Sequence, residues 1–178
     1  IDIVTGGFPC QDFSIAGKRL GFGSQNSHNG GKLSVDEPTA ENRGHLYLWM
    51  REVIALTEPK LFIAENVKGL TNLGDVKKII EHDFAKAGGN GYIVVPGRVL
   101  YAADYGVPQS RERVFFIGLK KSALTINARK ALTLPEIPPE YDPYPIKTHG
   151  GRLFPLVTCE DAFVGLSEPG ESADLSQR

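Results

Sequence analysis

Residues 60–65 read Lys-Leu-Phe-Ile-Ala-Glu, a short apolar run that ends on a carboxylate. A continuous run of this kind is expected of a strand that is buried on both faces of a parallel sheet. The chain opens on a second apolar run, residues 1–5, which we interpret as another buried strand because the Gly6-Gly7 pair after it allows a sharp turn. These two predicted strands indicate the class of fold, and polar residues follow each of them.

Apolar residues at helical spacing predict two amphipathic helices. The first covers about residues 44–57, and its expected apolar face holds Leu46, Trp49, Met50, Val53 and Ile54. The second begins after Asp75, the expected N-cap, and ends at Gly88-Gly89. Its expected apolar face holds Val76, Ile79, Ile80, Phe84 and Ala87.

Two further strands are predicted after the helices. One covers residues 92–101 with an interruption at Pro96-Gly97, and the other covers residues 114–119. The order strand, helix, strand, helix, strand, strand indicates an α/β domain with a largely parallel sheet. Ligands of such sheets bind beyond the carboxyl ends of the strands, so Cys10 and Glu65 are expected on the same rim.

Three segments lack the periodicity of helices and strands. Residues 17–42 are polar and are interpreted as a mobile loop, and loops this long in compact domains are typically functional lids or disordered. Residues 134–155 are rich in proline and resemble a stiff linker, and residues 167–178 form a polar tail. Between them, Thr158 with Asp161 three residues later predicts the start of a short helix.

The composition is that of one ordinary globular domain. The chain has 178 residues, which is long enough for one core. Its formal net charge of −1 argues against a protein that merely coats nucleic acid electrostatically. No apolar stretch is long enough to cross a bilayer, and residues 1–5 are no signal peptide. Because the chain lacks a starting Met and opens on a strand, we interpret it as part of something longer. Two cysteines make no disulfide framework, so a reducing, intracellular location is expected. No grouping of Cys and His residues has the spacing of a zinc site.

The first candidate active-site segment is Gly7-Phe8-Pro9-Cys10-Gln11-Asp12-Phe13-Ser14. A cysteine that directly follows a strand end and a turn is held rigidly and yet is exposed. Most cysteines are buried and inert, but the turn before Cys10 and the polar residues after it favour a nucleophile. The reactive species is the thiolate, and a free thiol with a pKa of about 8.5 is mostly neutral at pH 7 unless positive groups lie nearby.

Two further segments carry candidate groups. Glu65 ends an apolar strand, where a carboxylate is costly unless it has a partner or a function. Taken alone, an ion pair with a neighbouring arginine is the simpler interpretation. In residues 109–113, Gln-Ser-Arg-Glu-Arg, the two arginines alternate, so both face one side of an extended chain and suit a phosphate or a base carbonyl oxygen. The ordinary alternative is a charged sheet edge with Glu112 as the counter-ion.

Together and in this order, these segments resemble the C5-cytosine methyltransferase family. Pro9-Cys10-Gln11 is similar to the nucleophile motif of the family, Glu65-Asn66-Val67 to its second catalytic motif, and Gln109-x-Arg111-x-Arg113 to its third. The connecting stretches also fit, at residues 13–18, 43–44 and 104–106. The resemblance covers residues 2–118 and, more weakly, the Pro-rich segment with residues 158–163, which is similar to the start of the variable target-recognition region.

The resemblance implies a Rossmann-like, S-adenosylmethionine-dependent methyltransferase sheet with helices on both faces. It also implies methyl transfer to C5 of a cytosine that is flipped out of double-stranded DNA. Cys10 is the implied nucleophile that adds to C6, Glu65 supports protonation at N3, and Arg113 with Arg111 binds O2. Two residues have implied supporting roles, Pro9 at the edge of the methyl donor and Asn66 as a brace of the nucleophile loop. The residues implied to contact DNA are Gln11, Ser14, Lys18, Arg19 and Gln109.

The resemblance also divides the chain and implies its partners. Residues 1–119 are expected to form the catalytic part, and residues 120–178 a Pro-rich linker with the beginning of the target-recognition region. The Gly-rich cofactor loop and the acidic ribose-binding residue of the family belong upstream of Ile1, so a complete cofactor pocket is not expected here. The implied partners are double-stranded DNA and a companion restriction enzyme, without a metal or a membrane. The implied location is the bacterial cytoplasm, at the nucleoid.

Three other functions remain open. A tRNA cytosine-C5 methyltransferase of the same lineage has similar catalytic motifs, although residues 14–18, Ser-Ile-Ala-Gly-Lys, and the Pro-rich segment favour DNA. A non-catalytic DNA-binding remnant is the second alternative, and the intact candidate residues Cys10, Glu65, Arg111 and Arg113 argue against it. A thiol hydrolase is disfavoured because no histidine stands in an evident base position.

Overall fold

The computed structural model describes residues 1–8, 47–72 and 75–166 of the chain. These residues belong to two compact units, and we describe each by itself. The sheet unit consists of residues 1–100 and 112–146, and the loop unit consists of residues 101–111 and 147–178. No helix in the described part of the chain is both long enough and apolar enough to cross a bilayer.

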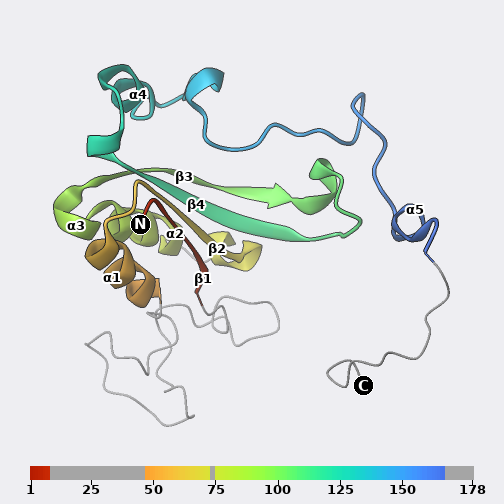
Figure 1. Cartoon of the computed structure of the whole chain (residues 1–178), viewed down its shortest axis with the longest axis horizontal. Helices are drawn as coiled ribbons and strands as arrows, with labels where there is room; N and C mark the ends of the chain where they lie inside the picture. The colour runs from red at the N-terminus through yellow and green to blue at the C-terminus, as the bar shows by residue number, and fades with distance from the viewer. Residues whose placement is uncertain (9–46, 73–74, 167–178) are drawn as a thin grey trace, which may run out of the picture. The chain divides into compact units, whose positions relative to one another are not determined.

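Four strands form one sheet in the order β1-β2-β4-β3 (Figure 1). They are β1 (Ile3–Gly7), β2 (Leu61–Val67), β3 (Tyr92–Tyr101) and β4 (Glu112–Lys120). β1 and β2 are parallel, as predicted, but β4 runs antiparallel to β2. The sheet is therefore mixed, and the prediction of a largely parallel sheet is wrong for this part of it.

β3 is continuous, so the predicted interruption at Pro96-Gly97 is wrong as well. Proline cannot donate a hydrogen bond to a neighbouring strand, which confines it to the edges of sheets and to bulges. Within the described sheet β3 is an edge strand, so it accommodates Pro96. The amide of Gly97 donates instead to Oε1 of Glu81 at 2.6 Å.

Helix α1 (Tyr47–Thr57) confirms the first predicted helix, but its buried face differs from the prediction. Trp49 and Val53 are exposed, whereas Tyr47 and Ile54 are buried. The tyrosine hydroxyl explains this orientation, because it donates a hydrogen bond of 2.5 Å to Asp83 of helix α2. The ring of a tyrosine packs in an apolar core while its hydroxyl makes a hydrogen bond to a polar group.

Helix α2 (Val76–Ala85) confirms the second predicted helix, with Asp75 at the N-cap position. The Asp75 side chain makes no capping hydrogen bond and pairs with Lys78 at 3.1 Å instead. The predicted apolar face is buried except for Ile79, which is 41% exposed. The helix ends before α3 (Ala87–Asn90), where Gly88 has a φ of 56° that few other residues adopt.

The helices α1, α2 and α3 cover one face of the sheet with an aromatic core. Its largest fully buried side chains are Phe62, Phe84 and Phe116. The rings of Phe62 and Phe84 meet edge to face with centroids 5.3 Å apart, an arrangement that aromatic pairs favour.

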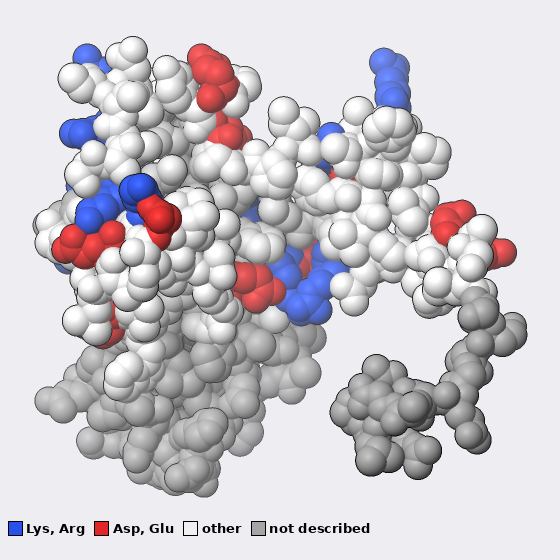
Figure 2. Space-filling view, viewed as in Figure 1, with Lys and Arg blue, Asp and Glu red and all other residues white. Residues whose placement is uncertain are grey.

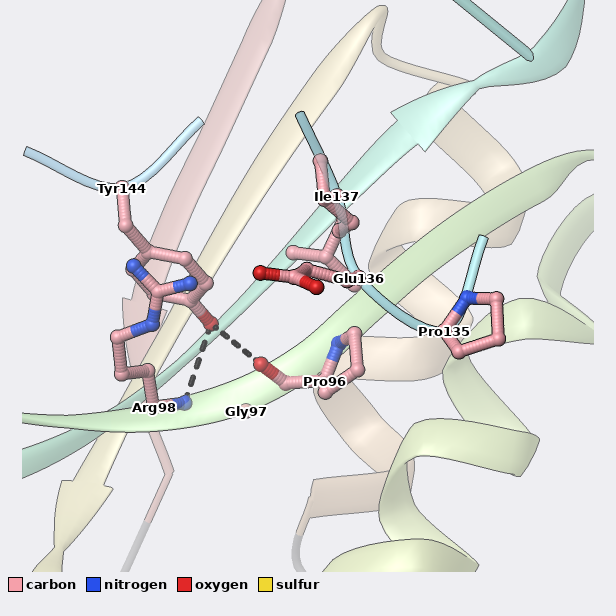
Figure 3. Close-up of a pocket in the computed structure, with 8 residues that line it drawn as sticks. Pro96, Gly97, Arg98, Pro135, Glu136, Ile137 and Tyr144 are labelled. Carbon is pink, nitrogen blue, oxygen red and sulfur yellow. Dashed lines mark hydrogen bonds between the residues drawn. The ribbon is translucent and has the colours of Figure 1, made fainter. Parts of the chain in front are cut away.

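The opposite face is covered by the segment that follows β4. This segment contains helix α4 (Ile126–Ala131), and its Leu132 and Tyr144 are buried against the sheet. The hydroxyl of Tyr144 donates to the carbonyl of Phe115 of β4 at 2.7 Å. It also accepts from the amide of Arg98 of β3, so it anchors the segment to two strands; Figure 3 shows this bond. Burial raises the pKa of this phenol to about 12. Helices therefore lie on both faces of the sheet, as the resemblance implied.

The loop unit confirms the short helix predicted after Thr158. Helix α5 (Cys159–Phe163) begins with a capping box in which the Thr158 side chain accepts from the amide of Asp161 and the Asp161 side chain accepts from the amide of Thr158. In the same unit, the carbonyl of Asp104 accepts hydrogen bonds from the amides of Thr148 and His149. These bonds tie the two chain segments of the unit together.

Replacing Gly118 of β4 by alanine is expected to destabilise the sheet unit. A Cβ atom on this residue would lie 2.0 Å from the ring of Phe62, which is itself fully buried. Overpacking of this kind costs about 1–3 kcal/mol. Urea denaturation of Gly118→Ala should show this loss, whereas Gly6→Ala is the matched control because its nearest neighbour is Met50 at 3.4 Å. Equal free energies of unfolding for the two variants would contradict the packing argument.

Candidate active site

The candidate site is built on the carboxyl ends of β1 and β2. Because these strands are parallel, their ends share one edge of the sheet, and Gly7 stands opposite Glu65 in the register. A Cβ atom on Gly7 would lie 3.1 Å from Oε2 of Glu65, so the absence of a side chain on Gly7 gives the carboxylate its space. The carboxylate therefore lies against the end of the strand that leads to Pro9 and Cys10, which are both outside the described residues.

Arg113 of β4 contacts this carboxylate directly. Its Nε lies 2.8 Å from Oε1 of Glu65, and the two side chains are 25% and 33% exposed. The antiparallel register pairs Arg113 with Val67, so the arginine reaches Glu65 diagonally across the same face of the sheet. The Nη1 of Arg113 also donates to the carbonyl of Glu112 at 2.8 Å. The guanidinium is thus fixed at two of its nitrogens.

Asn66 is the only polar or charged residue that is buried in the described part of the chain, with 1% of its surface exposed. Its Nδ2 donates to the carbonyl of Phe8 at 3.1 Å, and its Oδ1 accepts from the amide of Val67 at 2.8 Å. The ring of Phe8 packs in the aromatic core beside Tyr47 and Phe84. The residue before Pro9 is therefore held through both its backbone and its side chain.

The two arginines of the third motif differ in their settings. β4 begins at Glu112, so only Arg113 lies in the strand, and Arg111 belongs to the loop unit with Gln109. The carbonyl of Arg111 accepts from the amide of Ala102 at 2.8 Å, and its amide donates to the carbonyl of Gln109 at 3.0 Å. The sequence predicts that the side chains of Arg111 and Arg113 face the same side. These two residues belong to different units, so this stays a prediction. The other predicted DNA contacts, Gln11, Ser14, Lys18 and Arg19, lie outside the described residues.

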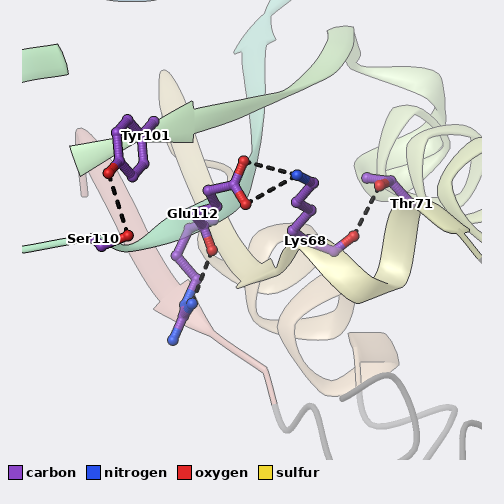
Figure 4. Close-up of polar contacts among 6 residues, drawn as sticks. Lys68, Thr71, Tyr101, Ser110 and Glu112 are labelled. Carbon is purple, nitrogen blue, oxygen red and sulfur yellow. Dashed lines mark hydrogen bonds and ion pairs between the residues drawn. The ribbon is translucent and has the colours of Figure 1, made fainter. Parts of the chain in front are cut away.

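Sequence reasoning missed Lys68, which directly follows β2. Its Nζ lies 2.8 Å and 2.9 Å from the two carboxylate oxygens of Glu112 (Figure 4). The sequence suggested Glu112 as the counter-ion of its neighbouring arginines, but its carboxylate pairs with this lysine. The signal that finds the pair is the antiparallel register of β2 and β4, since Val67 and Arg113 are the last partners and Lys68 and Glu112 come next to them.

A small apolar cleft lies beside the end of β1. It has a volume of about 310 Å³ and is lined by Val4, Thr5, Gly6, Gly7, Phe8, Trp49, Met50 and Val53. Ligand pockets of proteins have volumes of about 300–1,000 Å³, so this cleft has room for part of a small molecule. None of these lining side chains is charged.

The charges of the described surface are mixed. Figure 2 shows basic and acidic side chains beside each other on the face in view, rather than one continuous basic surface. Among the described residues, no group of three or more His, Cys, Asp and Glu side chains could hold a metal ion. In the described part of the site, the carboxylate of Glu65 and the guanidinium of Arg113 are in direct contact.

Comparisons with known proteins show the family of the chain. The family model described as C-5 cytosine-specific DNA methylase matches residues 1–148. The type II methyltransferase M.BspRI of Lysinibacillus sphaericus is 37% identical over 174 residues, which are 95% of this chain and 32% of the relative. The type II methyltransferase M.HpaII of Haemophilus parainfluenzae is 37% identical over 127 residues, which are 68% of this chain and 29% of the relative.

A solved structure has a similar fold. It is described as a DNA modification methyltransferase encoded within a prophage of E. coli, with a TM-score of 0.54 and 25% sequence identity. The match covers 95% of this chain and 36% of that one. The chain thus spans about a third of the length of the proteins that it matches here. It belongs to the family of C-5 cytosine-specific DNA methylases.

Proposed function

We propose that this chain carries the catalytic residues of an enzyme that transfers a methyl group to C5 of cytosine in double-stranded DNA. The observation that carries the proposal is the ion pair of Glu65 and Arg113, 2.8 Å long, at the end of the strand beside β1. Cys10 is three positions after Gly7, and three positions span at most about 11 Å of chain. Chain connectivity alone therefore keeps the proposed nucleophile near this pair.

In the proposed reaction the Cys10 thiolate adds to C6 of the cytosine. The new S–C6 bond moves the electron pair of the C5–C6 double bond toward C5, so a poor nucleophile becomes a good one. After methyl transfer, C5 loses its hydrogen as a proton, and the electron pair restores the double bond as the thiolate leaves C6. Covalent catalysis divides one difficult step into easier ones.

Glu65 and Arg113 bind the polar edge of the base in this proposal. Glu65 hydrogen-bonds the N3 and amino edge and supports protonation at N3 as the thiolate attacks. Arg113 binds O2, where negative charge develops. Because its guanidinium is already fixed, little reorganisation is needed during the reaction. Arg111 is proposed to assist at O2 from the loop unit, and Asn66 to support the nucleophile loop through its bond to Phe8.

S-adenosylmethionine is the proposed methyl donor, and it supplies a methyl group on a positively charged sulfur. The apolar cleft beside β1 fits a part of this cofactor, but it offers no charged side chain for the amino and carboxylate groups. We therefore assign only Pro9, at the edge of the donor, and derive no further contacts to it.

The proposed partner is double-stranded DNA, from which the target base is flipped out at a cost of a few kcal/mol. Gln11, Ser14, Lys18, Arg19 and Gln109 are the proposed DNA contacts. Residues 120–178 are proposed as the linker and the beginning of the target-recognition region, after the catalytic part in residues 1–119. Since the named relatives are type II methyltransferases, a companion restriction enzyme and a bacterial cytoplasmic location belong to the same proposal.

Covalent trapping tests the proposal as a whole. Fluorine at C5 cannot leave as a cation, so a methylated adduct with 5-fluorocytosine should persist. Duplex DNA that carries 5-fluorocytosine in place of every cytosine contains the unknown target site. Incubated with this DNA and the methyl donor, the full-length protein should form a complex that resists denaturant, and peptide mapping should place the link on Cys10.

The controls of this experiment separate the alternatives. A link on Cys159, the exposed cysteine at the start of helix α5, would overturn the site assignment. Trapping on tRNA that contains 5-fluorocytidine, without trapping on DNA, would identify an RNA methyltransferase. No adduct with either nucleic acid would favour the non-catalytic remnant.

A further inference from the structure

The end of the β2–β4 ladder carries two ion pairs. The first joins the proposed catalytic groups Glu65 and Arg113 at 2.8 Å. The second joins Lys68 and Glu112 at 2.8 Å, through both oxygens of the carboxylate (Figure 4). The proposed reaction uses the first pair and leaves the second without a role.

The two pairs are adjacent along both strands. Val67 and Arg113 are the last partners of the ladder, and the chain then turns into the 3₁₀ helix η3 (Lys68–Asn72). Side chains alternate between the faces of a strand, so Glu112 and Arg113 point to opposite faces. The first ion pair therefore connects β2 with β4, and the second connects the residue after β2 with the opposite face of β4. Both are at the place where the ladder ends.

We propose that Lys68 is a positioning residue that holds Glu112, and through it Arg113, in place for the reaction. This inference rests on the proposed function. Lys68 and Glu112 touch neither the base nor the donor in this account; they fix the end of β4 from which Arg113 extends.

The hydrogen bonds of Arg113 connect the position of Glu112 to the orientation of the guanidinium. Its Nη1 donates to the carbonyl of Glu112 at 2.8 Å, while its Nε contacts Glu65. The orientation of the Glu112 peptide group therefore sets the orientation of the guanidinium. A strand end without a partner opens more readily than its centre, and movement of Glu112 would shift the donor that faces O2.

The lysine is itself fixed at its backbone. The hydroxyl of Thr71 donates to the carbonyl of Lys68 at 2.8 Å, within the first turn of η3. The side chains of Lys68 and Glu112 are 49% and 43% exposed. Exposed ion pairs contribute little to overall stability, so the expected effect is on the placement of Arg113 rather than on folding.

The test compares Lys68→Gln with Lys120→Gln in the full-length protein. Lys120 is the matched control, since it ends the same strand β4 and pairs with Glu58 at 2.7 Å, far along the strand from the site. A misplaced catalytic group costs up to about 10²-fold in rate, and we expect Lys68→Gln to lower kcat about tenfold. KM for DNA should stay within about twofold, because no DNA contact is lost. Lys120→Gln should keep the wild-type kcat.

Charge reversal supplies the second readout. Glu112→Gln should reproduce the loss of kcat, and the double variant Lys68→Glu with Glu112→Lys should recover most of it. A lysine that instead binds a DNA phosphate would give a raised KM in Lys68→Gln and no recovery in the double variant. A raised KM in Lys68→Gln, or no recovery of kcat in the double variant, overturns the proposal.

Hydrogen exchange separates failure of this inference from failure of the proposed function. Amide exchange over residues 112–115 should be faster in Lys68→Gln than in the wild type and unchanged in Lys120→Gln. Unchanged exchange in Lys68→Gln overturns the positioning role whether or not the protein methylates DNA. A wild-type protein that shows no methyl transfer overturns the proposed function, and with it the catalytic meaning of the pair.

Discussion

Replacing Cys10 by alanine is expected to abolish methyl transfer by the full-length protein. Alanine removes the thiol of the Pro9-Cys10-Gln11 motif, so C6 has no nucleophile and C5 is never activated. Loss of a covalent nucleophile typically lowers kcat by about 10⁴-fold or more. DNA binding should remain largely intact, because the proposed phosphate and base contacts are made by other side chains.

Transfer of a radioactive methyl group to duplex DNA measures this loss, and a filter-binding assay measures the affinity for DNA. Cys159→Ala is the control, since this cysteine is exposed and its Sγ contacts the carbonyl of Pro108 within the loop unit. The control should retain wild-type activity. Appreciable turnover by Cys10→Ala would rule out the covalent mechanism, and loss of DNA binding would point to a structural role of Cys10.

The sequence was sufficient to predict the strands that hold the site. The apolar runs at residues 1–5 and 60–65 became β1 and β2, and their parallel pairing brings Gly7 opposite Glu65. An uninterrupted apolar run indicates a strand that is covered on both faces, and β2 has no exposed residue. In β1, however, Ile3 is 56% exposed, so the prediction that this strand is buried is wrong. The short helix at Thr158 was also predictable, because a capping box depends only on residues three positions apart along the chain.

Other features depend on contacts between distant residues, and periodicity does not reveal them. The direction of β4 is one, since an apolar run reads the same in a parallel and an antiparallel strand. The rotation of α1 is another, because the bond from Tyr47 to Asp83 joins residues that are 36 positions apart. The pair of Lys68 and Glu112 is 44 positions apart and required the register of β2 and β4.

The ion pair of Glu65 and Arg113 also shows why one contact supports two interpretations. A structural pair and a catalytic pair have the same geometry, a carboxylate 2.8 Å from a guanidinium. The location distinguishes them in part, since the carboxylate lies against the glycine at the end of the strand that leads to Cys10. Only a change that keeps the contact and removes the proton chemistry separates the two roles.

Glu65→Gln is such a change, and it is expected to slow the chemical step by about 10²–10⁴-fold, the usual contribution of general acid–base catalysis. Glutamine has nearly the shape of glutamate, and its amide oxygen can still accept from Nε of Arg113, so the fold of the site should persist. The amide cannot supply a proton to N3, however, and the attack of Cys10 then builds negative charge that is not neutralised.

Single-turnover methyl transfer at saturating DNA measures the chemical step, and the dissociation constant for DNA is measured separately. Glu52→Gln is the matched control, since Glu52 lies on α1 and pairs only with its neighbour Arg51 among the contacts of the described residues. It should leave both quantities unchanged. If Glu65→Gln weakens binding while the single-turnover rate stays at the wild-type value, Glu65 only positions the base, and the proton at N3 must come from another group. If instead the rate falls and binding persists, the pair with Arg113 is part of the reacting site and not merely a link between two strands.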